Sequence, residues 1–373
     1  MRLVRTPLLS RRLFLAGAGS AFAAGLLPRE ADAFEGTDAL YASAVRRDDG
    51  GFGCAIFAED GRIVCEVPLP DRGHDVAFDP VSRRAVAFAR RPRTFAVVFD
   101  PMSGAIERTL TSAEGRHFFG HGFFSPDGKL LYATENDFAE ARGLIGVYDV
   151  ARDFARIGEF ETHGMDTHEA LLMPDGETIV VANGGIETHP DYGRQKLNIP
   201  TMDPSLVFID RRTGDLVSQH RLPADLHQLS IRHLAIDGRS RVWFGCQYEG
   251  ADIDVPQLTG FASPENGLQL AELPRSQLVQ LSNYVGSVAA NRDGSRIALS
   301  SPVGGTFLIL DAATVRIIGE RRIEDGCGLA PSGPGFIATS GKGLVAEIGA
   351  KTLEPRHTTY HFDNHVLSLR RSA

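Results

Sequence analysis

The sequence predicts an all-β protein built as a single seven-bladed β-propeller. Three observations carry this prediction. A strand–turn–strand unit recurs along the chain, most copies are followed by a second hairpin, and no long amphipathic helix follows the N-terminal segment. Four antiparallel strands in a repeat of about 40 to 65 residues are the sequence signature of a propeller blade. The 40 Gly and 20 Pro among 373 residues suit a chain so rich in turns.

The first element is a targeting segment, residues 1–33. It starts with basic residues, continues with a Gly/Ala-rich apolar run over residues 13–27 and ends with the small residues ADA. This order is typical of an export signal cleaved after Ala33, and SRRLFLA resembles a twin-arginine (Tat) motif. The run is shorter than the roughly 20 residues of a spanning helix, although an uncleaved anchor is the alternative. We therefore expect a folded protein in the periplasm, free of the membrane after cleavage, with the propeller over residues 34–373.

Charge and cysteine content limit the partners. The formal net charge is −8, and the body of the chain has no Lys/Arg cluster, which argues against nucleic acid or anionic lipid as a partner. We expect a monomer. Four Cys are too few for a disulfide framework. Cys54 and Cys65 flank a hairpin and could pair across it, but we favour two small core residues.

The repeat defines seven innermost strands, one per blade. The seventh lies at the C-terminus with nothing after it to complete a blade. The stretches ALYASAV, GFGCAIFAE and RIVCEVPL, which follow the targeting segment, have the pattern of the missing second, third and fourth strands. The last blade is therefore expected to close by joining both ends of the chain, which leaves no open sheet edge. The innermost strands begin near His74, His121, His168, His233, Ser287, Cys327 and His365.

Five of these seven strand entrances carry a histidine. In a propeller all the entrances lie at one mouth of the central channel, so the fold would bring the five imidazoles together. Neutral imidazole is a good ligand for Zn, Cu, Fe and Ni, and Tat export is often used by proteins that fold around a cofactor. We expect a transition metal, iron or copper, bound by His74, His121, His168, His233 and His365. The candidate further ligands are Cys327, His117 and His361.

The register of these histidines leaves two alternatives open. Counted from the proline position of the following turn, His74 and His168 lie six residues away, but His121 and His233 lie five. That difference reverses the side-chain direction on a regular strand. Either the strand entrances are irregular, or the imidazoles do not form one ring. The structural alternative is a histidine hydrogen-bonded within its own blade, as in WD-repeat propellers.

Polar residues at the ends of the second strands are expected at the same mouth. The stretch NGGIETHPDYGRQKLNIPTMDPS forms a loop of about twenty residues, and long loops in compact folds are usually functional or disordered. Because it mixes glycines, prolines and apolar residues, we interpret it as an ordered lid or partner-docking loop, with a decorative insertion as the alternative. The candidate substrate or partner residues are Asn183, Glu187, His189, Arg194, Lys196 and Asn198, with Glu135 and Gln247 from neighbouring strand ends.

The Tat-like signal, the seven-bladed pattern, GH before the second-blade turn and NGGIETHP-DYGR-KLN together resemble a family of exported bacterial propellers. Genes of that family commonly lie beside imelysin-type periplasmic proteins and a di-haem thiol-oxidoreductase-like protein. The resemblance covers essentially the whole chain. It implies a periplasmic role in iron uptake and an imelysin-like or haem-containing partner, but brings no established activity.

Other propellers share parts of this pattern. The histidine arrangement resembles the propeller of nitrous oxide reductase, but the copper-binding electron-entry domain of that enzyme has no counterpart here. WD40/YVTN-like and quinoprotein-dehydrogenase-like propellers share the fold, which does not by itself fix function.

Two functions from different classes stay open. The first is a metal-binding periplasmic protein, with the long loop controlling access. The second is a non-enzymatic scaffold whose loop-bearing face docks an imelysin-like or haem protein. Stoichiometric metal separates them. A third interpretation is a hydrolase or lactonase that uses Glu135 or Glu187 with a mouth histidine as general base. The sequence contains no nucleophile elbow, phosphate loop or dinucleotide fingerprint, so enzymatic turnover is left undecided.

Overall fold

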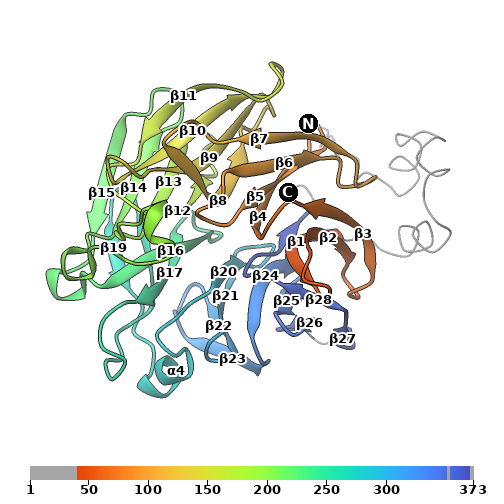
Figure 1. The fold of residues 1–373 in the computed structure, drawn as a ribbon. Coiled ribbons are helices and arrows are strands. Elements are labelled where there is room, and N and C mark those ends of the chain that lie inside the picture. Colours follow the sequence, from red (N-terminus) through yellow and green to blue (C-terminus); the bar gives the residue numbers. More distant parts are fainter. Residues whose placement is uncertain (1–39, 351–352, 370–373) are drawn as a thin grey trace, which may run out of the picture.

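The computed structural model describes residues 40–350 and 353–369. The predicted targeting segment and its predicted cleavage site lie outside these residues. Seven sheets surround a common axis, with the first strand of each blade innermost and the last strand at the rim (Figure 1). Within the described ranges, no helix has the length and apolar character needed to cross a membrane.

Blades 1 to 6 are antiparallel sheets of four consecutive strands. Blades 1 to 3 consist of β4 (Gly73–Asp79), β5 (Arg84–Ala89), β6 (Phe95–Phe99), β7 (Ile106–Thr111); β8 (Arg116–Phe124), β9 (Leu130–Asp137), β10 (Arg142–Asp149), β11 (Ala155–Glu161); and β12 (Thr167–Leu172), β13 (Thr178–Asn183), β14 (Ser205–Asp210), β15 (Leu216–Arg221). Blades 4 to 6 consist of β16 (Leu229–Ile236), β17 (Val242–Tyr248), β18 (Thr259–Ser263), β19 (Gly267–Leu270); β20 (Ser287–Ala290), β21 (Arg296–Ser301), β22 (Thr306–Asp311), β23 (Ile317–Arg322); and β24 (Gly326–Ser332), β25 (Gly335–Ser340), β26 (Leu344–Ile348), β27 (Arg356–His357).

The seventh blade joins the two ends of the described chain, as predicted. Its second, third and fourth strands are β1 (Leu40–Arg47), β2 (Phe52–Ala58) and β3 (Ile63–Leu69). Its innermost strand is interrupted, because β28 (Tyr360–Phe362) and β29 (Leu367–Ser368) both pair with β1. His365 lies between these two short strands.

The innermost strands begin irregularly, which resolves the register question. A β-bulge or irregularity interrupts the pairing near each histidine of blades 1 to 4: after Gly73, after Phe118, after Thr167 and after Ile231. A bulge redirects a side chain that a regular strand would send to the opposite face. The different spacings of the histidines from their turns are therefore compatible with one common direction.

The core lies between neighbouring blades, where large aromatic side chains such as Phe88, Phe208 and Phe307 are fully buried. Cys54 is buried, Cys65 is partly buried, and no disulfide joins them. Cys54 lies opposite Val67 and Cys65 opposite Ile56, so the two cysteines are not cross-strand neighbours. The core interpretation is confirmed.

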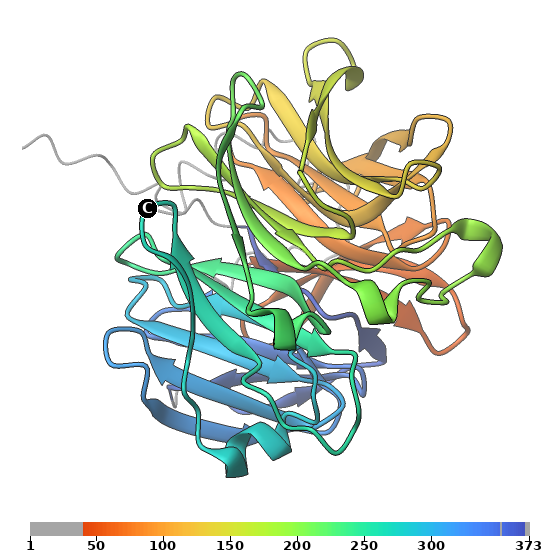
Figure 2. The ribbon, with the colours of Figure 1, turned by 90° about the vertical axis from the view of Figure 1, so that its left-hand side faces the viewer.

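The two faces of the propeller carry different connections, because antiparallel strands alternate in direction. The turn face carries the turns between first and second strands and between third and fourth strands. The loop face carries the longer connections between second and third strands and from one blade to the next. All four helical segments of the described chain lie in loop-face connections outside the sheets (Figure 2). They are η1 (Pro190–Tyr192), η2 (Ile199–Thr201), η3 (Ala224–Leu226) and α4 (Arg275–Gln280).

Candidate metal centre

Five buried histidines meet at the loop-face end of the channel, each no more than 9% exposed. The centroids of successive imidazoles lie 4.7, 4.9, 5.3, 4.9 and 4.8 Å apart, and His121 and His365 lie 4.6 Å apart across the group, so the five imidazoles form one compact cluster. The distance of 4.8 Å spans blades 5 and 6, which contribute no histidine. We call this group the five-histidine centre; in order around the channel its members are His365, His74, His121, His168 and His233.

The imidazoles are close enough to share a metal ion. Two groups of three, His74/His121/His365 and His121/His168/His233, each have ligand atoms within 4.8 Å of one another. Nitrogen ligands at about 2.0–2.1 Å from one Zn²⁺ ion lie at most about 4.2 Å apart, so small inward rotations suffice. A third group adds the carboxylate of Glu169 to His233 and His365.

Carboxylates hydrogen-bond two of the five imidazoles on the side away from the channel, and a third carboxylate lies close to His233. Each carboxylate belongs to the blade before that of the histidine it contacts. In its own blade it stands directly after the inner histidine, or two residues before it, and its side chain reaches toward the next blade. A histidine that binds metal through one nitrogen almost always has such a partner on the other, which fixes the ring orientation and raises its basicity. The hydrogen bonds to Nδ1 are Asp363–His74 at 3.0 Å and Asp75–His121 at 3.0 Å, whereas Glu169 stands 3.4 Å from His233 Nδ1 without a hydrogen bond.

His168 has no such carboxylate, and the reason is steric. The residue that follows His121, in the place of Asp75 and Glu169, is Gly122. A Cβ atom there would lie 2.4 Å from the ring of Phe88 and 2.6 Å from the carbonyl oxygen of Tyr132. Blade 2 therefore has no room for a side chain directed at His168.

Six ring nitrogens of this centre are buried without a hydrogen-bond partner among the described residues. They are Nε2 of His121, Nε2 of His365 and both nitrogens of His168 and of His233. An unsatisfied buried polar atom costs about 1–3 kcal/mol, and native proteins satisfy nearly all such atoms. So many unsatisfied nitrogens in one cluster are therefore expensive unless a ligand engages them.

Burial keeps most of these imidazoles neutral. It lowers the pKa values of His74, His168 and His233 well below the ordinary range, with further contributions from nearby arginines and histidines. Burial, with the charge of His121, lowers the pKa of His365 to about 4. Neutral imidazole is the form that binds a metal ion, so four of the rings are prepared for that role.

The pKa values of His121 and Glu169 are raised instead of lowered. Burial opposes protonation of His121, but its hydrogen bond with Asp75 and the nearby Glu169 outweigh burial and raise its pKa. Burial raises the pKa of Glu169 to about 8. A protonated Glu169 would have to release its proton to bind a metal ion.

The three further candidate ligands lie away from the five-histidine centre. The thiol of Cys327 lies 3.6 Å from the carbonyl oxygens of Thr339 and Phe362, and burial raises its pKa to about 12. In His117 the Nδ1 atom lies 3.0 Å from the Phe118 carbonyl oxygen and Nε2 lies 3.1 Å from the Asn136 amide. In His361 the two nitrogens face the Gly341 carbonyl oxygen and Asp48.

Two of the polar strand-end residues support their own blades instead of facing the mouth. Glu135 is fully buried and accepts hydrogen bonds from Tyr148 and Arg156 in blade 2. Asn183 accepts a hydrogen bond from Thr167 and donates one to the carbonyl oxygen of Thr162. The sequence pattern placed both at strand ends correctly, but cross-strand contacts within the blade take up their polar groups.

Gln247 lies at the end of β17, where it forms an isolated bridge with Tyr284 at the loop face.

The long loop of blade 3 is anchored by hydrogen bonds within itself and by an ion pair to blade 4. Asn198 closes it by accepting a hydrogen bond from the Glu187 amide at 2.7 Å and donating to the Gly185 carbonyl oxygen at 3.0 Å. His189 accepts a hydrogen bond from Asp191 at the start of η1, and Lys196 pairs with Glu249 of blade 4. Arg194 is exposed on the loop. This anchoring fixes the loop on the loop face, over blades 3 and 4.

The sequence reasoning missed the charged residues that surround the histidines. The signal was present, because each adjoins an inner histidine or stands two residues before it in the stretches GHD, THE, IRH and DNH. The residues are Asp75, Glu169, Arg232 and Asp363; Arg90, at 2.8 Å from His74 Nδ1, had no such signal.

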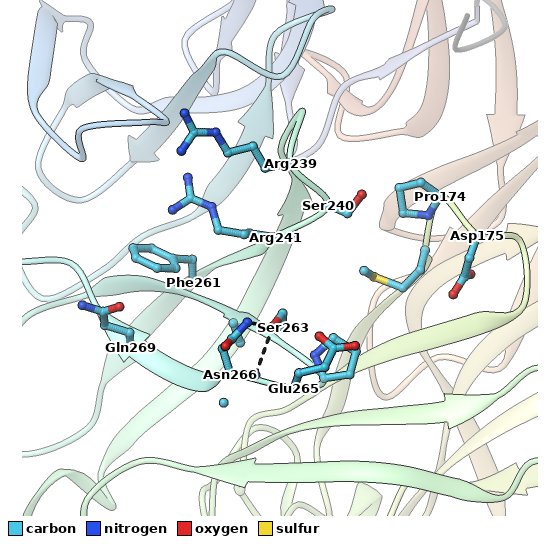
Figure 3. Close-up of a pocket in the computed structure, with 14 residues that line it drawn as sticks. Pro174, Asp175, Arg239, Ser240, Arg241, Phe261, Ser263, Glu265, Asn266 and Gln269 are labelled. Carbon is cyan, nitrogen blue, oxygen red and sulfur yellow. Dashed lines mark hydrogen bonds between the residues drawn. The ribbon is translucent and has the colours of Figure 1, made fainter.

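A groove on the turn face lies apart from this centre. It has a volume of about 600 Å³ and is lined by the turns at Pro174, Ser240 and Glu265 (Figure 3). Its Arg241 is already engaged by Asp237 and stacks on Phe261, with 4.4 Å from the guanidinium carbon to the ring centroid. Arg241 is therefore not available to a ligand in this groove.

Fold and site together define a seven-bladed β-propeller with a buried centre of five histidines at one end of its channel. The chain belongs to the family described as "Protein of unknown function (DUF1513)", whose model matches residues 67–369.

Among solved structures, hydrazine synthase of Kuenenia stuttgartiensis is similar, with a TM-score of 0.58 and 16% sequence identity over 84% of this chain and 94% of that chain. At this identity the likeness shows the fold alone. A search of curated proteins finds no match.

Proposed function

We propose that this protein binds a transition metal, iron or copper, at the five-histidine centre. The observation that carries the proposal is the set of six buried ring nitrogens without hydrogen-bond partners among the described residues. One of their rings, His121, and the neighbouring His74 are held at Nδ1 by carboxylates. An imidazole-rich donor set suits Fe, Cu, Zn and Ni better than Mg or Ca. One or two ions fit the donor count, because the three candidate ligand groups overlap.

Different residues of the chain would have different roles in binding the metal. His74 and His121 would bind through Nε2 while Asp363 and Asp75 hold their Nδ1 atoms. His168 and His233 would contribute nitrogens without a fixed orientation. The loop over residues 184–204, anchored by Asn198 and by the Lys196–Glu249 pair, would limit access to the mouth. With export to the periplasm, this supports a role in iron or copper handling outside the cytoplasm.

Metal content is the decisive measurement. The protein should be exported through its own signal and purified without a histidine tag or a chelator. We expect at least one equivalent of Fe or Cu by mass spectrometry, with an absorption band. Protein that is isolated empty, and that takes up neither Fe nor Cu after purification, would overturn the proposal.

A second candidate function, docking of a partner protein, is favoured by the apolar side chains of the loop face. Five large apolar residues are exposed in its connections, with Ile253 at 83% and Val303 at 69%. The five lie in four connections of blades 3 to 5, and exposed apolar side chains mark an interaction site where they are contiguous. An imelysin-like or haem-containing protein is the partner that the resemblance implies. The five residues are Tyr192, Leu197, Ile253, Val279 and Val303.

This candidate has its own test. A purified imelysin-type protein should bind the wild type, and the double variant Ile253→Ser/Val303→Ser should bind it at least tenfold more weakly. The control is Val81→Ser, which removes an apolar side chain that is 57% exposed at the turn face. Equal binding by both variants would exclude docking through this face.

A further inference from the structure

Basic side chains gather beside the five-histidine centre, within a protein whose net charge is −8. Arg90 lies with Nη1 at 2.8 Å from His74 Nδ1 and at 3.2 Å from Asp363. Arg232, which immediately precedes His233, is only 5% exposed. Both guanidinium groups therefore lie next to the imidazoles that we assign to the metal.

Arg232 has an unfilled hydrogen-bonding position. Its Nη2 atom is buried and has no hydrogen-bond partner. The two nearest carboxylates, Asp166 and Glu249, stand 3.9 and 3.8 Å away, which is beyond hydrogen-bond distance. A guanidinium presents a planar fork of donors that matches the geometry of a carboxylate or phosphate, so an oxyanion would satisfy the free position.

Further arginines add positive charge to the region around Arg90 and Arg232. Burial, partly offset by Asp166, and the charges of Arg232, Arg194 and Arg90 lower the pKa of Arg91 to about 10. Burial and the charges of Arg90, Arg72 and Arg232 lower the pKa of Arg194. The positive charges that lower the pKa values of Arg91 and Arg194 act on one region, in which an anion would be stabilised. We call Arg72, Arg90, Arg91, Arg194 and Arg232 the arginine cluster.

The same region holds an acceptor without a donor. Asp166 is fully buried, and neither of its carboxylate oxygens has a hydrogen-bond partner. Its backbone has a φ of 56°, a conformation that costs a non-glycine residue energy and persists only where the surroundings impose it. Thr188, in the long loop, also has a buried hydroxyl oxygen without a partner. A ligand that carries a hydroxyl group beside its anionic group would satisfy Arg232 and Asp166 together.

We propose that the arginine cluster binds a small hydroxylated oxyanion, with its carboxylate or phosphate on Arg232 and Arg90 and its hydroxyl donating to Asp166. Bound there, the anion lies against His74 and His233 and would supply oxygen ligands to the metal ion. The contact with the metal rests on the proposed function, whereas binding to the arginines does not. The protein would then take its metal as a complex with such an anion, not as the bare hydrated ion.

The test is calorimetric titration of the metal-free protein with citrate, tricarballylate and phosphate. Citrate and tricarballylate carry the same three carboxylates, but only citrate has the hydroxyl group. We expect citrate to bind at least tenfold more tightly than tricarballylate, because a hydrogen bond to a charged group contributes about 1.5–3 kcal/mol and about 1.4 kcal/mol is tenfold in affinity. Equal affinities for citrate and tricarballylate would show that Asp166 does not contact the ligand. Tighter binding of citrate than of phosphate assigns a hydroxycarboxylate, and the reverse assigns a phosphate ester.

Variants locate the site. Arg232→Gln should weaken citrate binding at least tenfold, whereas Arg239→Gln, on an exposed arginine of the turn face, should leave it unchanged. Because Arg232 is buried, Arg194→Gln on the exposed loop provides a second variant that does not disturb the core, with an expected loss of about threefold. If the wild type binds none of the three anions at millimolar concentration, or if the Arg232, Arg194 and Arg239 variants bind equally, the proposal is wrong.

The two proposals can fail separately. The variant His121→Ala/His168→Ala should lose its metal but still bind citrate through the arginines. Loss of citrate binding together with the metal in this variant would place the anion on the histidines and overturn the arginine assignment. Anion binding by a wild-type protein that takes up no metal would overturn the proposed function alone.

Discussion

The two faces of this propeller use the same residue types in opposite ways. On the turn face, aspartates accept hydrogen bonds from the backbone of their own turns. Asp175 binds the amides of Glu177 and Thr178, and Asp237 binds those of Arg239 and Arg241. At the mouth on the loop face, Asp166 and several imidazole nitrogens are buried without a partner.

This difference indicates that the polar groups of the turn face contribute to stability, whereas those at the mouth serve a function. The aspartates of the turn face fix the geometry of their turns. Burial would raise the pKa values of Asp175 and Asp237, but the hydrogen bonds that these carboxylates accept outweigh burial and lower both pKa values. The polar groups at the mouth cost stability in the metal-free protein. Natural proteins tolerate such local violations mainly at functional sites, so the contrast itself indicates which face carries the function.

The largest expected effect is the loss of metal from the mouth. His121→Ala together with His168→Ala leaves no complete three-histidine group. The remaining group relies on Glu169, whose pKa burial raises to about 8, so that it would have to lose a proton to bind metal. We expect metal content to fall to background by mass spectrometry while the circular dichroism spectrum keeps its β signature. The control is His220→Ala/His227→Ala, which removes two histidines outside the centre and should keep full metal content. Full metal content in the first variant would disprove the ring assignment.

The next largest effect tests the carboxylates behind the ring. Asp75→Asn keeps the shape of the side chain but removes the charge that orients His121. Changes of this kind typically reduce metal affinity about 10–100-fold, which competition with a chromogenic chelator would measure. The matched control is Asp127→Asn at an exposed turn of the opposite face, for which no loss is expected. An unchanged affinity in the Asp75 variant would mean that His121 is not a ligand through Nε2.

On the turn face the expected effect is on stability alone. Asp237 is buried and accepts hydrogen bonds from two turn amides, from Arg241 and from the indole of Trp243 at 2.9 Å. Asp237→Ala leaves these donors unsatisfied, and we expect the free energy of unfolding to fall by about 3 kcal/mol. Urea denaturation measures this change, while metal content per folded molecule should stay at the wild-type value. A loss of metal from the folded variant would show that the two faces are coupled.

The smallest effect has the opposite sign. His168→Leu replaces an imidazole that has two unpartnered nitrogens with an apolar side chain of similar volume. We expect the metal-free variant to be more stable than metal-free wild type by about 1 kcal/mol, with metal affinity reduced. Urea denaturation of both metal-free proteins provides the comparison. A loss of stability of similar size would mean that His168 has a structural role in its blade.

The sequence was sufficient for the architecture. The number of blades, the closure by β1, β2 and β3, and the histidines at five strand entrances all follow from turn motifs and strand patterns that are local in the chain. The same local reasoning was insufficient for Glu135 and Cys327. Both occupy strand positions that point toward the mouth by pattern, but Glu135 is held by Arg156 and Cys327 packs among apolar residues between blades 6 and 7.

Thus the sequence by itself determined how the chain repeats and where each histidine stands in its repeat, because the period of a strand and the chemistry of a turn act over a few residues. Only the tertiary structure decided that irregular strand entrances bring the five imidazoles into one cluster, that Asp363 and Asp75 support histidines of the next blade, and that Gly122 leaves His168 without such support. These contacts join residues of different blades. They depend on how neighbouring sheets pack, and no local pattern contains that information.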